Sequence, residues 1–190
     1  MTPSRRRVFL LGALALVAAG FAYAYWLSLV PATHPDHDHG ILNLDAGGRL
    51  NVITREGSKR NLVGRPGKTL VVHFFSSSAP GAAEELAGIF RLQAELKADP
   101  GVEFVLIAHD PDFATLDAWL RQKGLVAPAP ATFVLDPSGD TTQKLNCKRP
   151  LETMFFTADG KLSSQARGAL EWPEGALGHL ERARGGEAIE

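Results

Sequence analysis

The sequence predicts an α/β domain, a three-layer sandwich with a mixed central sheet, and one transmembrane helix before it. Three observations predict it. Strand and helix patterns alternate over residues 69–135, which favours parallel strands joined by right-handed crossovers. Two adjacent strands and a final helix follow, so the sheet also contains an antiparallel hairpin. A run of 23 residues without a charge, residues 8–30, stands near the N-terminus.

The uncharged run predicts a membrane anchor. At about 1.5 Å per residue, it spans a hydrocarbon core of roughly 30 Å. The three arginines at 5–7 place residues 1–7 in the cytoplasm. We therefore expect a single-pass protein of the bacterial inner (cytoplasmic) membrane, with its domain in the periplasm or outside the cell. Two alternatives stay open: residues 22–24 have the form of a signal-peptidase site, and residues 4–10 are similar to a twin-arginine signal.

Residues 31–40 form a polar linker that contains three histidines, His34, His37 and His39, in the pattern H-P-D-H-D-H. Imidazole and carboxylate groups suit Cu(II), Zn or Ni. Capture of Cu or Zn beside the membrane is therefore one hypothesis, and a solvated linker that binds no metal is the simpler one. The sequence predicts no other cofactor.

The domain is expected over residues 41–184, followed by a short tail at 185–190. Period-two alternation and apolar runs predict strands at 41–44, 50–53, 69–75, 102–108, 131–135, 153–157 and 161–164. Helical spacing predicts helices at 83–97, from 113 to a stop at Gly124, and at 173–184. The first two strands are expected to pair as a hairpin. In the first helix, polar residues such as Glu85 lie between the apolar positions.

Four stretches of this domain carry a resemblance. They are G-R-P-G-K-T-L-V-V-H-F-F (64–75), A-P-G-A-A-E-E-L (79–86), T-F-V-L-D-P-S-G (132–139) and R-P-L-E-T-M-F-F-T-A-D-G-K-L (149–162). In order and spacing they resemble membrane-anchored, extracytoplasmic thioredoxin-fold proteins of the TlpA/ResA kind, within the redoxin (AhpC/TSA-type) group. The resemblance implies a thioredoxin-like three-layer sandwich.

The chain departs from that family at its reactive positions. Where the family has C-P-P-C, this sequence has Ala79, Pro80, Gly81 and Ala82. Dithiol exchange needs an attacking thiolate and a resolving sulfur, so the resemblance implies a redox-inactive protein. A register nearer the copper-chaperone SCO branch would place Ser78 and Ala82 at the cysteine positions, and it also leaves no thiol pair.

The family also has a cis-proline before its fourth strand. In this sequence Leu151 stands at that place and Pro150 comes one residue earlier, and a one-residue slip stays open. We expect the two loops to line a partner-binding surface made of Ser76, Ser77, Ser78, Arg149, Pro150, Leu151 and Glu152. The three serines at the start of a helix are expected to supply cap or turn hydroxyls.

Cys147 is the one cysteine of the chain, which excludes an intramolecular disulfide. A lone cysteine is more often a packed residue than a reactive one. A one-cysteine redoxin is the alternative, in which Lys148 and Arg149 favour the thiolate. Of the remaining histidines, His73 is expected to be a satisfied core or edge residue and His109 a turn residue. Trp119 and Trp172 are expected in the core.

The sequence therefore favours a binding protein over an enzyme. Its predicted role is to hold, or to help assemble, a membrane or periplasmic protein partner. The net charge is −1, and no basic stripe stands out, which argues against nucleic acid as a partner. Metal handling and a one-cysteine redoxin remain the alternatives.

Overall fold

The computed structural model describes residues 51–61, 67–96, 99–128, 131–147, 151–168 and 170–189. The chain divides into two compact units, 1–39 and 40–190, and the described residues all belong to the second. The expected anchor, histidine linker and strand 41–44 lie outside them. Within these ranges, no helix has both the length and the apolar character that crossing a bilayer requires.

The domain is built on one seven-stranded sheet with the order β2-β1-β5-β4-β3-β6-β7. The strands are β1 (Asn51–Ile53), β2 (Lys59–Asn61), β3 (Thr69–Phe75), β4 (Val102–Ala108), β5 (Thr132–Leu135), β6 (Glu152–Phe156) and β7 (Leu162–Arg167). Strands β3, β4 and β5 are parallel, and the other pairs are antiparallel. The predicted mixed sheet is confirmed.

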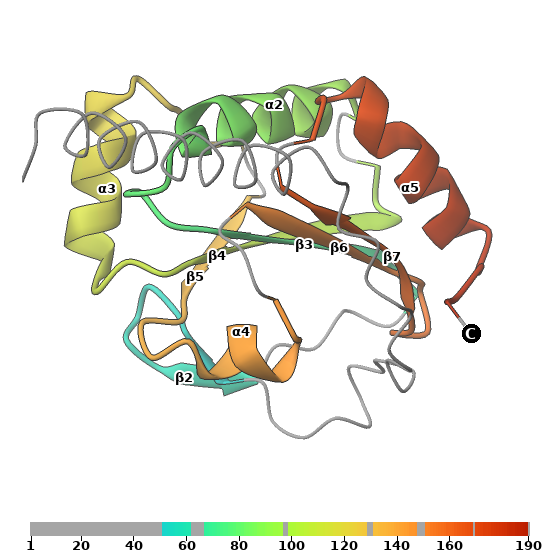
Figure 1. Ribbon diagram of the computed structural model, residues 1–190, viewed down its shortest axis with the longest axis horizontal. Helices are drawn as coiled ribbons and strands as arrows, with labels where there is room; N and C mark the ends of the chain where they lie inside the picture. Colours follow the sequence, from blue (N-terminus) through green and yellow to red (C-terminus); the bar gives the residue numbers. More distant parts are fainter. Residues whose placement is uncertain are drawn as a thin grey trace, which may run out of the picture. The chain divides into compact units, whose positions relative to one another are not determined.

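Helices cover both faces of this sheet, as the three-layer prediction required (Figure 1). The helices are α2 (Ala82–Glu95), α3 (Phe113–Gln122), α4 (Asp140–Lys144) and α5 (Glu174–Arg184). Helices α2, α3 and α5 contribute to one apolar core, and the residues that follow α4 contribute to the other. Both faces of the sheet are therefore buried.

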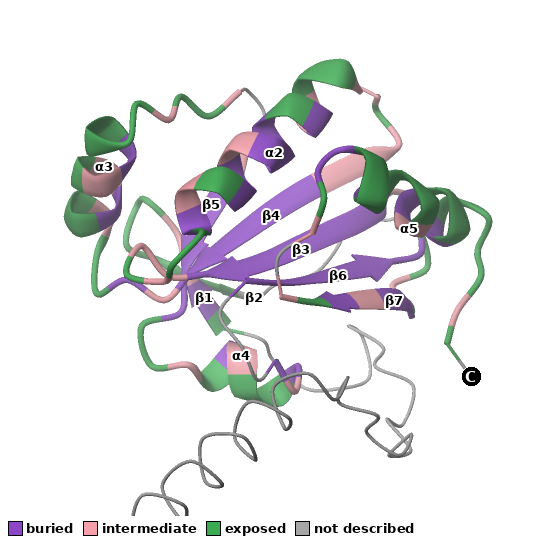
Figure 2. Cartoon of the chain, turned by 45° about the horizontal axis from the view of Figure 1, so that its top comes forward, coloured by how far each residue is buried: buried purple, intermediate pink, exposed green. Residues whose placement is uncertain are grey.

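The central strand β3 shows how the two cores arise. Successive side chains of a strand point to opposite faces. Val71 and Phe75 enter the core under α2, whereas Leu70, Val72 and Phe74 enter the core on the α4 side. All seven residues of β3 are buried, which is visible in the colouring of Figure 2. A strand buried on both faces reads as a continuous apolar run, and this is why the sequence identified it.

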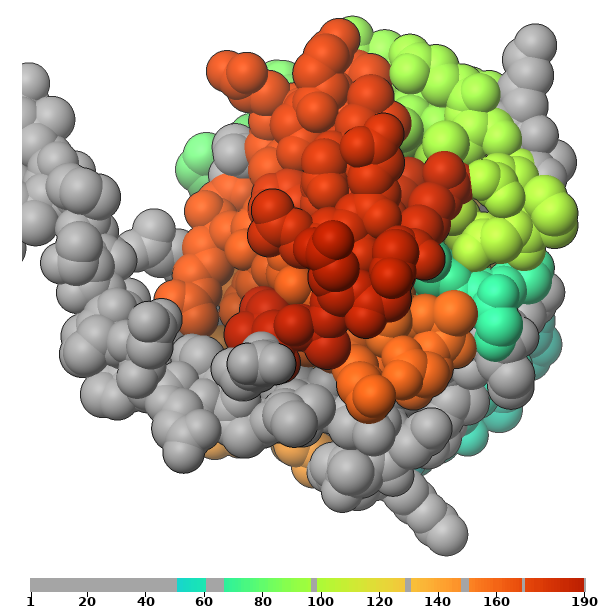
Figure 3. Space-filling model, turned by 90° about the vertical axis from the view of Figure 1, so that its right-hand side faces the viewer, coloured from blue at the N-terminus to red at the C-terminus, as the bar shows by residue number. Residues whose placement is uncertain are grey.

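Helix α5 closes the β6–β7 side of the domain. The His179 ring stacks on Phe155 with centroids 5.1 Å apart, and its Nδ1 lies 3.0 Å from the Ser164 hydroxyl. The Ile189 N–H donates to the Leu162 carbonyl over 2.9 Å, so the C-terminal residues are tied to β7. Figure 3 shows this C-terminal part, in orange to red, gathered on one face.

Two elements were not predicted. Strand β2 pairs with β1 through a turn closed by the Gly57 N–H on the Thr54 carbonyl. Its sequence, Lys-Arg-Asn, has no apolar alternation to reveal it. Helix α4 has five residues, Asp-Thr-Thr-Gln-Lys, and is held by Asp136, whose carboxylate accepts the Thr142 N–H and hydroxyl at 2.8 and 2.7 Å. Neither element has the apolar periodicity from which the others were predicted, since β2 is held by its pairing with β1 and α4 by the Asp136 side chain.

Candidate functional site

The candidate site lies between the C-terminal end of β3 and the N-terminus of α2. Gly81 is the N-cap residue of α2, with φ +83° and no side-chain cap. A residue with a Cβ is strained at this angle, so glycine fits the turn. Glu84 and Glu85 stand in the first helical turn, where negative charge is favourable. The sequence thus starts a helix at the place where a redox pair would stand.

The three serines before this helix form a turn and do not cap it. The hydroxyls of Ser76 and Ser78 lie 2.9 Å apart. The Ser77 N–H donates to the Asp110 carboxylate over 3.3 Å, and the Ser77 hydroxyl donates to the same carboxylate. Of the two roles predicted for these serines, the structure supports the turn. Asp110 is buried and follows β4, so this tie joins the ends of two parallel strands.

The two positions of the missing thiols are occupied by methyl groups. Ala82 is fully buried, and Ala79 is half-buried and packs against the core under α2. The Ala82 N–H donates to the Ala79 carbonyl over 3.2 Å, so the turn that would hold the two sulfurs close together is present. Because neither residue titrates or carries a nucleophile, the turn cannot perform thiol exchange.

Leu151 faces this turn from a distant part of the sequence. Its Cδ1 lies 3.6 Å from the point where a Cβ on Gly81 would stand. Leu151 has φ +67°, an angle that is unusual for a residue with a Cβ. Its N–H donates to the Phe74 carbonyl over 3.0 Å, and its carbonyl accepts the Gly168 N–H over 2.9 Å. The structure therefore brings together the two loops that the sequence assigned to one surface.

The other residues of that predicted surface are placed differently. Arg149 and Pro150 lie outside the described residues. The cis peptide bond of the described chain is Trp172–Pro173. Glu152 requires a correction, because its side chain is fully buried and cannot line a docking surface. Strand alternation sends Glu152 to the face opposite Leu151.

On that opposite face, Glu152 is held by several donors. The Cys147 thiol donates to its carboxylate over 3.1 Å, the Gln165 amide donates to it, and the Arg167 Nε lies 3.4 Å from Oε1. Cys147 itself is buried. A carboxylate beside a buried thiol disfavours the thiolate. This environment fits a packed cysteine better than a reactive one.

Glu85 forms buried hydrogen bonds, although the sequence indicated only a polar position between the apolar residues of this helix. Its carboxylate accepts the Trp172 indole N–H over 2.5 Å and the Leu170 N–H over 2.6 Å. Burial raises the pKa of Glu85, and these two hydrogen bonds act in the opposite direction. The link joins α2 to the segment before α5. Helical spacing places Glu85, and not Glu84, on the face of Ala82 and Ile89, but it does not identify Trp172 as the partner.

His73 lies in the middle of β3, the strand that leads into the candidate turn. Its Nδ1 lies 2.9 Å from the Thr153 hydroxyl, and its buried Nε2 has no partner among the described residues. Burial lowers the pKa of His73 to about 3, so the ring is neutral at physiological pH. The Phe75 and Trp172 rings lie 6.0 and 6.3 Å from it. The prediction of a satisfied core histidine holds for one ring nitrogen.

No metal site is found among the described residues, where no group of three histidine, cysteine or carboxylate side chains could hold an ion. His109, which directly follows β4, makes a structural contact with α4. Its Nε2 lies 2.8 Å from the Thr142 hydroxyl. His34, His37 and His39 lie outside the ranges that the structure describes.

Comparison with known proteins defines the fold. No protein-family model and no curated protein matches the chain. A secreted disulfide oxidoreductase of Mycobacterium tuberculosis, homologous to DsbE of E. coli, superposes with a TM-score of 0.56 and 20% identity over 69% of this chain and 93% of its own. StoA from Bacillus subtilis gives 0.56 and 15% over 73% and 98%.

A candidate thiol:disulfide interchange protein DsbE from Chlorobium tepidum gives a TM-score of 0.60 and 21% identity over 72% of this chain and 94% of its own. The described domain therefore has the thioredoxin-like fold of thiol-disulfide oxidoreductases. More narrowly, it is a redoxin-type domain without a C-x-x-C pair, because Ala79 and Ala82 stand in the turn before α2 and Cys147 is the one cysteine.

Proposed function

We propose that the chain is a membrane-anchored, extracytoplasmic protein of TlpA/ResA type that binds a protein partner and does not exchange disulfides. Its role would be to hold, or to help assemble, a membrane or periplasmic partner. One observation carries the proposal: the turn from Ser76 to Ala82 and the Leu151 loop still meet, although both sulfur positions hold alanine. The two loops therefore keep the arrangement of a binding surface, although the cysteine pair that exchanges disulfides is absent.

The exposed part of this surface supports a binding role. Ser78, Pro80 and Gly81 are exposed and Ala79 is half-buried, so these residues offer contact area, whereas Leu151 is buried and supports the turn from the core. The Ser77–Asp110 tie and the two backbone bonds of Leu151 hold both loops in place before any partner arrives. A preorganised surface costs less entropy on binding than a mobile one.

The anchor and the location are part of the same proposal and rest on the sequence. Residues 8–30 are long and apolar enough to span the bacterial inner membrane, and the preceding arginines orient them with the domain outside the cytoplasm. A tethered domain meets partners in or near the same membrane at a high effective concentration. This favours a membrane or periplasmic protein as the partner.

Site-specific photocrosslinking in native membranes tests the proposal. Benzoylphenylalanine at Ser78 reports on the candidate surface, and the same probe at Ser138, an exposed turn residue after β5, is the matched control. We expect one discrete adduct from position 78 and none from position 138, and mass spectrometry of the adduct identifies the partner. Equal labelling at both positions, or none at position 78, would contradict a partner at this surface.

The geometry around Cys147 does not favour the one-cysteine redoxin. The thiol is buried and donates to Glu152, whereas a reactive cysteine is accessible to solvent. Titration of the native thiol with an aromatic disulfide at neutral pH separates the two roles. Slow reaction without denaturant and fast reaction after unfolding supports packing, and fast reaction in the folded protein supports the enzyme.

A further inference from the structure

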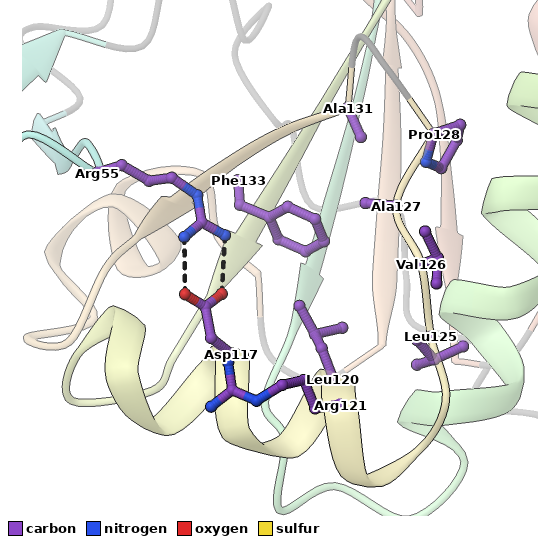
Figure 4. Close-up of a pocket in the computed structure, with 10 residues that line it drawn as sticks. All are labelled: Arg55, Asp117, Leu120, Arg121, Leu125, Val126, Ala127, Pro128, Ala131 and Phe133. Carbon is purple, nitrogen blue, oxygen red and sulfur yellow. Dashed lines mark hydrogen bonds and ion pairs between the residues drawn. The ribbon is translucent and has the colours of Figure 1, made fainter.

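An open groove lies on a different part of the domain, between α3 and residues 125–128, which follow that helix. It has a volume of about 450 Å³ and lies beside Leu120, Leu125, Val126, Pro128 and Phe133. Figure 4 shows the Arg55–Asp117 pair at one end and the 125–128 segment at the other, with the Phe133 ring between them. The groove does not include the turn before α2.

The floor and one rim of the groove are apolar. Leu120 and Phe133 belong to the core under α2 and are almost fully buried. Val126 on the rim has 85% of its surface exposed, the highest exposure among the large apolar side chains of the described chain. The exposed Val126 side chain, beside the edges of Leu120 and Phe133, gives a partner a small apolar contact area.

The charged end of the groove is positive. Arg55 forms a bidentate pair with Asp117, with both N–O distances at 2.8 Å, and its guanidinium lies 4.8 Å from the centre of the Phe113 ring. These two charges neutralise each other. Arg121 also lines the groove and is exposed, and its charge contributes to the lowered pKa of Asp117 although the two form no ion pair. With two arginines against one aspartate, the lining has a net positive charge that a ligand carboxylate can pair.

The backbone of the rim is also open to a partner. The N–H groups of Val126 and Ala127 form no backbone hydrogen bond within the described part of the chain, and both residues are exposed. An extended peptide can use such groups for main-chain pairing while alternate side chains enter a pocket. The groove thus offers an apolar floor, a backbone edge and one cation.

We propose that this groove docks an extended segment of a partner protein in which a large apolar side chain is followed by a carboxylate. The apolar side chain lies on Leu120 and Phe133, the carboxylate pairs with Arg121, and the backbone runs beside Val126. Charge complementarity selects an acidic segment over a basic one. The inference is independent of the surface before α2, so either can fail without the other.

Binding of defined peptides to the full-length protein in lipid nanodiscs tests the inference. The probe is acetyl-Gly-Ser-Phe-Glu-Ser-Gly-amide with a fluorescent label, and two control peptides replace Glu by Lys or Phe by Ser. We expect fluorescence anisotropy to give a dissociation constant below about 1 mM for the Phe-Glu peptide and binding at least about tenfold weaker for both controls. Methyl resonances of Val126 should shift during the titration.

Three exposed positions provide variants that leave the core intact. Val126→Asp should weaken the Phe-Glu peptide about tenfold or more, and Arg121→Glu should reverse the preference between the Glu and Lys peptides. Lys123→Glu changes charge at the same end of α3 but outside the groove, so it should leave binding within about twofold. A reversed preference cannot result from simple unfolding.

Several results would overturn the inference. No binding at millimolar peptide, or equal binding of the Glu and Lys peptides, would remove the acidic segment as the occupant. Dodecanoate binding that Val126→Asp abolishes, without peptide binding, would assign the groove to a lipid chain. A concentration-dependent dimer that Val126→Asp dissociates would assign it to a second copy of this chain.

Discussion

Leu151 and Glu152 are neighbours in the chain but lie in two different chemical environments. Leu151 faces the turn before α2, where Ala79 and Ala82 leave no titratable side chain within the motif. Glu152 points to the opposite face, into contact with the Cys147 thiol and Arg167. The two positions where a redoxin reacts are therefore apolar, whereas Glu152 on the opposite face is held by polar contacts in the interior. Buried polar groups of this kind stabilise the fold and do not reach a substrate.

The largest effect should come from returning sulfur to the turn. We expect Ala79→Cys with Ala82→Cys to create a reactive dithiol, because the turn is intact and the N-terminus of the 14-residue α2 favours a thiolate. The measurement is insulin reduction and thiol titration at pH 7, where the native protein should show only background. Thiol-disulfide exchange should therefore be absent in the native protein and present in the double variant.

The two single variants are the controls for this experiment. Ala79 is half-buried and Ala82 fully buried, so Ala79→Cys should react quickly with an aromatic disulfide and Ala82→Cys slowly. If the double variant forms no disulfide, the turn differs from that of a redoxin in more than its two alanines. The conclusion that only the two cysteines are missing from this surface would then be wrong.

The second effect concerns His73 behind the turn. Its pKa is about 3 in the folded protein and about 6.5 in the unfolded chain, so between these values the unfolded state binds the proton. Stability is therefore complete above about pH 6.5 and is lost as the pH falls toward 3. The free energy of unfolding should decrease by up to about 1.4 kcal/mol per pH unit in this window.

His73→Asn isolates this contribution, because asparagine keeps a polar group for the Thr153 hydroxyl but does not titrate. The quantity to measure is the difference in unfolding free energy between the native protein and the variant, from denaturant titrations at several pH values. The difference should shrink steadily as the pH falls below 6.5. Parallel curves across the window would show that the imidazole is accessible to protons in the fold.

A third effect tests Glu85, the link on the α2 side. Glu85→Ala leaves the Trp172 indole N–H and the Leu170 N–H without their acceptor in a buried site. We expect a loss of about 3 kcal/mol in the free energy of unfolding at pH 7. Glu84→Ala, one residue earlier and exposed, should change stability by less than about 0.5 kcal/mol. Similar losses would mean that the link contributes nothing.

The sequence predicted the parts of the fold that repeat a local pattern. Strands β3 and β4 are apolar runs, and α2 and α3 have helical spacing, so burial and periodicity identify them. Strand β2 and α4 were missed because both are short and polar, Lys-Arg-Asn and Asp-Thr-Thr-Gln-Lys, and so have no apolar periodicity. The contacts that hold them, with β1 and with the Asp136 carboxylate, leave no such pattern in the sequence.

The same distinction applies to the candidate site. Gly81 and the two alanines were identified from their order between a strand and a helix, and the facing position of Leu151 followed from the resemblance. The burial of Glu152 and the Glu85–Trp172 bond were not predicted. Strand alternation gives the face that Glu152 takes, but it does not reveal the buried partners on that face. The partner of Glu85 lies 87 positions away, and no spacing rule identifies it.

The smallest effect compares two glycines in helices. A Cβ on Gly88 of α2 would lie 2.3 Å from the Trp172 Cβ and 2.8 Å from its Cγ, so α2 and the segment before α5 would have to separate. Gly88→Ala should therefore cost about 2 kcal/mol, as overpacking in a core does. Gly178 of α5 has open space, and Gly178→Ala should stabilise the protein by about 0.5–1 kcal/mol through helix propensity. Denaturant unfolding of both variants decides the point. Opposite signs would show that Trp172 packs closely on α2 and, together with its hydrogen bond to Glu85, fixes α2 to the segment before α5. A stabilising Gly88→Ala would instead mean that Trp172 lies farther from α2.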